Sequence, residues 1–67
     1  MVVIGEGVWR EECIAAIDID REDCEVQVFP VNCSDYVPYT FDSPEETLEA
    51  YRKAVTAWNE WMKGRVR

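Results

Sequence analysis

The sequence has no histidine, only three glycines and three prolines, and half as many basic as acidic residues. Without histidine, Ser-His and Cys-His nucleophilic sites, histidine zinc ligands and imidazole pH switches are excluded. The longest uncharged stretch, residues 26–34, is far shorter than the roughly 20 apolar residues of a membrane helix. The N-terminus carries Glu6 and no basic segment, unlike a secretory signal. These absences predict a cytoplasmic protein.

Catalytic and metal-binding patterns are also missing. Three cysteines, Cys13, Cys24 and Cys33, are an odd number without the density of a disulfide scaffold, so we expect buried, reduced thiols. They form no C-x-x-C pair, which a zinc site would favour. The acidic run that begins at Asp18 lacks the glycine and glutamate of an EF-hand loop. The sequence therefore predicts no catalytic residue, no cofactor and no metal site.

The composition is that of one small globular domain, residues 1–67, with 48% apolar and 31% charged residues. The formal net charge is -7. Residues 1–50 hold 13 acids and two bases, whereas residues 51–67 hold one acid and five bases. Residues 1–50 are therefore strongly acidic, and residues 51–67 are basic.

Alternating apolar and polar residues predict a β-hairpin in the first half of the chain. Residues 13–20 and 24–30 each alternate with a period of two, and a polar tip separates them. If residues 21–22 form a two-residue loop, Asp20 lies opposite Asp23.

Two other segments carry weaker strand signals, and a proline marks the end of the hairpin. Residues 2–9 are rich in β-formers, and Gly5 and Gly7 indicate a bulge or a sharp bend. Pro30 ends the second strand of the hairpin because it has no ladder donor. A short extended piece is expected around residues 39–41.

A long C-terminal helix has the strongest local signal. Ser43 suits the N-cap, Pro44 the first helical position, and Glu46 completes a capping box. Gly64 is a natural stop, so the helix is expected from about Pro44 to Lys63. The main apolar stripe is Leu48, Tyr51, Val55, Trp58 and Met62. A smaller adjoining stripe, which would let the helix lie close to the strands, is Ala50, Ala54, Ala57 and Trp61.

These elements predict an α+β fold: a three-stranded antiparallel sheet from the N-terminal half, packed against one long C-terminal helix. The second sheet face, or an edge strand, is left free to pair with a partner or with a second copy of the chain. The expected core residues are Val3, Ile17, Ile19, Val26, Val28, Leu48, Tyr51, Val55 and Trp58.

The acidic tip of the hairpin is the first candidate site. Its crowded carboxylates repel one another, and a basic partner would relieve that repulsion and accelerate association. The alternative is that these acids only keep a small domain soluble. Two tyrosines beside Pro38 are added as candidate interface anchors. The candidate partner-binding residues are Asp18, Asp20, Glu22, Asp23, Glu25, Tyr36 and Tyr39.

Three segments, in order, resemble the HicB-like antitoxin family. They are the hairpin Ile14-Ala-Ala-Ile-Asp-Ile-Asp20 to Glu25-Val-Gln-Val-Phe-Pro30, the segment Pro30-Val-Asn-Cys33, and the helix opening Asp42-Ser-Pro-Glu-Glu-Thr-Leu-Glu-Ala50. In that opening, Thr47 stands where the family has alanine. The resemblance covers residues 14–62 and implies a small acidic domain that docks on an RNA-acting toxin and blocks it. The family's frequent DNA-binding module is not among these residues, so operator binding is not implied.

Two functions are therefore expected. The first is a non-enzymatic acidic interaction protein that binds and inhibits a nucleic-acid-processing partner, as the resemblance implies. The alternative is a phage or mobile-element inhibitor of the anti-CRISPR type that occludes a basic nucleic-acid-binding surface. Direct binding to nucleic acid is not expected, because the strands carry acids where phosphate binding needs bases. A neighbouring toxin gene would favour the first function, and a phage anti-defence cluster the second.

Overall fold

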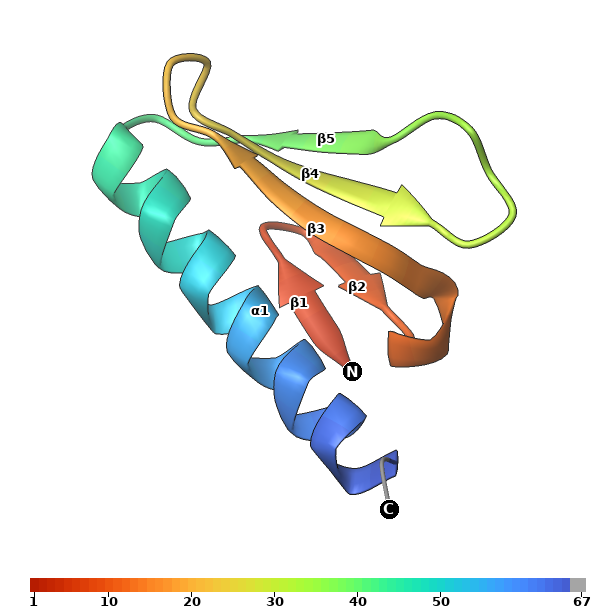
Figure 1. Ribbon diagram of the computed structural model, residues 1–67. Helices are drawn as coiled ribbons and strands as arrows, with labels where there is room; N and C mark the ends of the chain where they lie inside the picture. The colour runs from red at the N-terminus through yellow and green to blue at the C-terminus, as the bar shows by residue number, and fades with distance from the viewer. Residues whose placement is uncertain (66–67) are drawn as a thin grey trace.

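The computed structural model describes residues 1–65 of the chain (Figure 1). The elements are β1 Val2–Ile4, β2 Gly7–Trp9, the 3-10 turn η1 Glu11–Cys13, β3 Ile14–Asp20, β4 Glu25–Pro30, β5 Val37–Thr40 and α1 Pro44–Arg65. β3, β4 and β5 form an antiparallel sheet in that order, and the 22-residue helix lies across one face of it. The predicted α+β class, a three-stranded antiparallel sheet with one long C-terminal helix, is confirmed.

The third strand of this sheet is β5, and not the N-terminal segment. Residues 2–9 fold back on themselves, so that β1 pairs with β2 in a separate two-stranded hairpin. Gly5, with φ +58°, opens its two-residue turn, as in a type II′ turn, which favours glycine at that position. β1 lies next to α1 (Figure 1), and α1 contacts β1, β3 and β4. The helix and the hairpin therefore share one face of the sheet.

Gly7 is needed for a different reason. A Cβ at this position would overlap the phenol ring of Tyr39 on β5. The same ring anchors the hairpin to the sheet, because Oη of Tyr39 accepts a 2.9 Å hydrogen bond from Nε1 of Trp9. The missing side chain at Gly7 is what lets β2 approach β5 this closely.

The loop between β3 and β4 is longer than predicted. Asp20 pairs with Glu25, not with Asp23, so the two-residue loop is wrong and the loop spans residues 21–24. Oδ1 of Asp20 accepts hydrogen bonds from the backbone N–H groups of Glu22 at 3.1 Å and Asp23 at 3.2 Å. Cys24 closes the loop with φ +53°. A carboxylate thus stabilises the turn that glycine or asparagine would otherwise mark.

A bulge near the start of β3 reverses the predicted alternation there. The pairing with β4 shifts by one residue between Ile14 and Ala16, which leaves Ala15 without a partner. Ile14 is consequently buried and Cys13 exposed, and Cys33 is exposed in the segment after β4. The expected burial of the thiols is therefore wrong at Cys13 and Cys33.

The core lies between the sheet and the layer formed by α1 and the hairpin. Val26 and Val28 are fully buried, as predicted. In β1 the prediction is wrong, because Val3 is 58% exposed while Val2 and Ile4 are fully buried. The run Val-Val-Ile contains no polar residue, so its pattern could not show which residues face inward.

On α1 the small stripe, and not the large one, lies deepest. Ala54 is buried, as is Thr47, whose Oγ1 donates a 2.8 Å hydrogen bond to the carbonyl oxygen of Ser43. Small residues on this line let the helix approach the strands closely. The predicted core residues that are only partly buried are Ile17, Ile19, Leu48, Tyr51, Val55 and Trp58.

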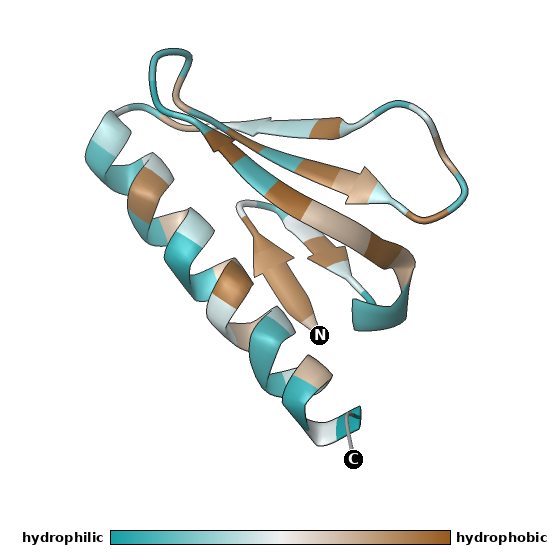
Figure 2. Ribbon diagram, in the orientation of Figure 1, coloured by the Kyte–Doolittle hydropathy of each residue, from teal (hydrophilic) through white to brown (hydrophobic). Residues whose placement is uncertain are grey.

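The helix begins as predicted and runs slightly further. Oγ of Ser43 accepts the backbone N–H of Glu46 at 3.2 Å and lies 3.3 Å from its carboxylate, which confirms the N-cap. The helix continues through Gly64 to Arg65 instead of stopping at the glycine. Polar and apolar residues alternate along it (Figure 2). No helix within residues 1–65 is long and apolar enough to cross a membrane.

Candidate partner-binding surface

One face of the β3–β4–β5 sheet is turned away from α1 and the hairpin, and we call it the open face. Its residues alternate with the buried Val26 and Val28 along β4 and are identified on β3 and β5 by cross-strand pairing. They are Ala16, Asp18, Asp20, Glu25, Gln27, Phe29, Pro38 and Thr40.

The open face has an acidic end and an aromatic end. The acidic end, beside the loop of residues 21–24, consists of Asp18, Asp20 and Glu25, and this loop is hydrophilic (Figure 2). At the aromatic end the rings of Phe29 and Tyr36 lie 5.4 Å apart between centroids, at 46° to each other. Four of the seven predicted partner-binding residues therefore belong to one continuous surface.

The carboxylates of the acidic end each have a local hydrogen-bonding role. Asp18 accepts the backbone N–H of Ile19 at 2.8 Å, and Glu25 accepts the side-chain amide of Gln27 at 2.8 Å. Asp20 holds the loop, as described above. These bonds explain why acids occupy the three positions even in the free protein.

Glu22 and Asp23, in the loop beside the acidic end, differ from these three. Both are exposed, and within residues 1–65 neither side chain makes a hydrogen bond or an ion pair. Nothing in the described fold requires a carboxylate at either position, so they are the acids best placed to serve a partner.

Within the described part of the chain the acidic end takes part in no ion pair, and Arg21 is the one base of the adjoining loop of residues 21–24. The ion pairs of residues 1–65 join Met1 to Glu11, Arg10 to Glu12 and Lys53 to Glu49, all outside the sheet. Like charges that lie directly opposite each other on paired strands, as Asp20 and Glu25 do, are destabilising. A basic partner would remove that repulsion.

Tyr36 and Tyr39 lie on opposite faces of the sheet. Tyr36 is 43% exposed and stacks with Phe29, whereas Tyr39 is partly buried beneath the hairpin and bonded to Trp9. Tyr39 is therefore used by the fold, and Phe29 takes its place beside Tyr36. Phe29 lies four residues after Glu25 on the same strand. This even spacing was visible in the sequence and indicates that both side chains lie on the same face of the sheet.

Each outer edge of the sheet has at least one position that offers no free N–H group to another strand. On β3 the N–H of Ile19 is taken by Asp18. After β5, the N–H of Phe41 points toward β4, because it donates a 2.9 Å hydrogen bond to the carbonyl of Cys24. Backbone groups alternate in direction along a strand, so those of Pro38, three residues earlier, point away from β4, toward the outer edge. Proline has no N–H to offer a new strand.

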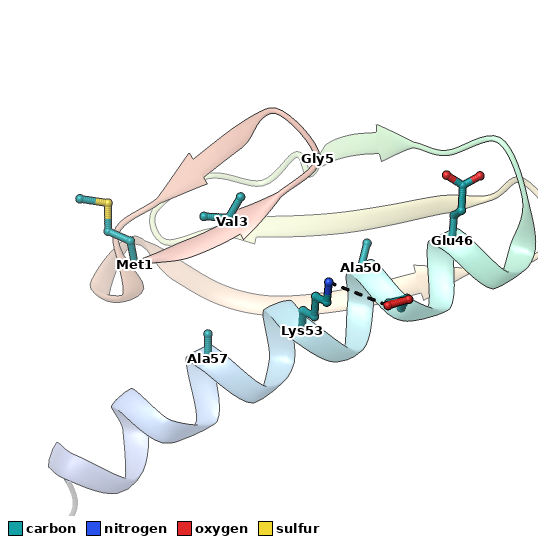
Figure 3. A pocket seen from close by; sticks show the side chains of 8 residues that line it. Met1, Val3, Gly5, Glu46, Ala50, Lys53 and Ala57 are labelled. Carbon is teal, nitrogen blue, oxygen red and sulfur yellow. Dashed lines mark ion pairs between the residues drawn. The ribbon is translucent and has the colours of Figure 1, made fainter.

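A shallow groove of about 550 Å³ lies between β1 and α1, on the opposite side of the molecule from the open face (Figure 3). Lys53 lies 3.8 Å from Glu49 on its helical wall, and the lining contains no Ser, Thr, Cys or Tyr. Within residues 1–65 no three Cys, Asp or Glu side chains are placed to hold a metal ion. The lining residues are Met1, Val3, Gly5, Glu46, Glu49, Ala50, Lys53 and Ala57.

One acid outside the sheet has a perturbed pKa. The pKa of Glu11 lies below its ordinary value, mainly because its carboxylate accepts a 2.5 Å hydrogen bond from the N-terminal ammonium of Met1. A backbone hydrogen bond lowers the pKa further. This contact ties the start of β1 to η1 and is structural.

Comparisons of the chain with protein-family models, with curated proteins and with solved structures find no match. The resemblance to the HicB-like family therefore stays a prediction from the sequence.

Proposed function

We propose that this chain is a non-enzymatic inhibitor whose open face binds a basic surface of a nucleic-acid-processing protein and keeps nucleic acid out. The observation that supports the proposal is the open face itself. It combines an acidic end, which takes part in no ion pair within residues 1–65, with a pair of aromatic rings.

The combination favours arginine on the partner. The guanidinium group of arginine forms paired hydrogen bonds with a carboxylate and also stacks on aromatic rings. The ammonium group of lysine is a point charge that does both less well. Surfaces that bind nucleic acid carry such side chains to neutralise phosphates. Phosphates themselves would be repelled, since β3, β4 and β5 contain no lysine or arginine.

The experiment uses the two acids that have no role in the fold. A tagged chain is used to capture its partner from the native host, and the purified partner is titrated with the wild type and with the double variant Glu22→Lys/Asp23→Lys. The control, Glu45→Lys/Glu60→Lys, makes the same change of net charge on α1. We expect the loop variant to weaken binding about tenfold or more and the control to change it far less.

The inhibitory part of the proposal has its own measurement. Labelled nucleic acid bound to the partner should be displaced by the chain at stoichiometric amounts, since both compete for one basic surface. If the chain and the nucleic acid bind together, or if the two double variants weaken binding equally, the open face is not the inhibitory surface. The identity of the captured protein, a toxin or a host-defence component, decides between the two expected biological settings.

A further inference from the structure

The outer edge of β2 is a second surface, remote from the open face. β1 pairs with one side of β2, and within residues 1–65 no strand pairs with the other side. Figure 1 shows β1 between α1 and β2, so the helix does not cover this edge. Beside a two-residue turn, Ile4 and Gly7 form the hydrogen-bonded pair, and the next residue, Val8, turns its N–H and C=O away from β1.

This edge lacks the protection found on the main sheet. No proline and no side-chain acceptor occupies it, and Val8 is 61% exposed beside its cross-strand neighbour Val3 at 58%. An unprotected edge with exposed β-branched residues is a template for another strand.

The sequence around Val8 is complementary to itself. We propose that two copies of the chain pair through antiparallel β2 edges, with Val8 opposite Val8 on the twofold axis. In this register Glu6 lies opposite Arg10 of the second copy, and the contact occurs twice. Both side chains are exposed, and the two residues flank β2 at even spacing from Val8.

Other symmetric registers lose the two Glu6–Arg10 contacts. An axis through Gly7 or Trp9 sets Val8 opposite Glu6 or Arg10, so that each charge faces an apolar side chain, and the remaining registers have the axis at Glu6 or Arg10. The registers with the axis at Glu6 or Arg10 would place Glu6 opposite Glu6 or Arg10 opposite Arg10, which is unfavourable. The existing Arg10–Glu12 contact, at 3.8 Å between exposed side chains, is weak enough to be exchanged.

The dimer joins the two hairpins into one four-stranded sheet, with a row of valines, Val3 and Val8 from each copy, across it. Strands of three residues bury much less than the roughly 1,200 Å² of specific stable complexes, so the dimer forms only at high protein concentration. The open face of each copy stays available, and the dimer does not depend on the proposed function.

Sedimentation equilibrium of the purified chain, from micromolar to millimolar concentration, tests the pairing. We expect Glu6→Arg to raise the dissociation constant of the dimer about tenfold, because two attractive contacts become repulsive. The exchange Glu6→Arg/Arg10→Glu should restore the wild-type value. Asp23→Arg is the matched control: it changes the net charge as Glu6→Arg does, but should leave dimerisation equal or slightly stronger.

Amide hydrogen exchange of the wild type gives a readout without any variant. Protection of the Val8 amide should rise with protein concentration, while that of exposed amides in the loop of residues 21–24 should not. A chain that is monomeric at every concentration would overturn the pairing. So would a double variant Glu6→Arg/Arg10→Glu that dimerises no better than Glu6→Arg alone.

Discussion

Replacing Gly7 by alanine should destabilise this protein severely, because the new methyl group has no room. The Cβ would overlap the phenol ring of Tyr39, and that ring cannot retreat without breaking its 2.9 Å hydrogen bond to Trp9. Overpacking of this kind costs about 1–3 kcal/mol, and the lost hydrogen bond about 0.5–1.5 kcal/mol. A chain of 67 residues has a free energy of unfolding of about 3–10 kcal/mol, so Gly7→Ala removes a large part of it.

Urea unfolding followed by tryptophan fluorescence measures the change. A double-mutant cycle with Tyr39→Leu identifies its cause: shortening residue 39 makes room for the methyl group, so the two substitutions together should cost at least about 1 kcal/mol less than the sum of the single ones. Additive effects would refute the steric explanation.

Two other glycines provide controls. At Gly64 nothing lies within 4 Å of an added Cβ, so Gly64→Ala should be neutral or stabilising by up to about 1 kcal/mol. At Gly5 an added Cβ meets only ordinary contacts, the nearest at 3.7 Å from Phe41, but φ is +58°, so Gly5→Ala should cost about 1–2 kcal/mol through the backbone alone. A Gly7→Ala variant within about 0.5 kcal/mol of the wild type would show that the hairpin does not pack on β5 as described.

Three further outcomes are expected. Trp58→Phe should be nearly neutral in urea unfolding, because the loss of apolar contact is offset by removing a buried indole N–H that has no acceptor within residues 1–65, whereas Trp9→Phe loses a made hydrogen bond and should destabilise. The lowered pKa of Glu11 means that its contribution to stability is present above the pKa of an unfolded glutamate and is lost as the pH falls through the folded value; Glu11→Gln should flatten the fall of the urea midpoint in that acidic range. In native thiol titration Cys13 and Cys33 should react quickly and the remaining thiol more slowly, three groups in all; a total of one would show a disulfide.

The helix and the fold class could be predicted because their signals are local. Ser43, Pro44 and Glu46 define the helix start within four residues, and the hydrogen bonds that cap it are made between those same residues. Which stripe of the helix lies deepest was harder to predict, since that depends on how closely the strands approach. The structure places Ala54 there because small residues permit the closest contact.

The sharp bend at Gly5 was predictable, but the packing of the N-terminal hairpin on β5 and the β3–β4 register were not. Gly7 marks a close approach to Tyr39, 32 positions away, and no local pattern shows that. The β3–β4 register depends on one carboxylate, Asp20, that bonds two loop amides, and the bulge at Ala15 leaves no signal in an apolar run. In the β3–β4 loop the Asp20 carboxylate replaces the turn residue that sequence rules look for.

The candidate site divides in the same way. Its acids were found from the sequence because all of them fall within one hairpin, where any register brings them to the same end. Its aromatic end depends on how β4 pairs with β5.

Tyr36 and Tyr39 are an odd number of positions apart, so on an extended strand they must point to opposite faces, and only one of them can join the acids. The pairing Val26–Tyr39 places Tyr39 beside a buried residue and leaves Tyr36 on the same face as Phe29. The aromatic part of the interface should therefore be tested at Phe29 and Tyr36: alanine there should weaken partner binding with little loss of stability, whereas alanine at Tyr39 should unfold the hairpin first.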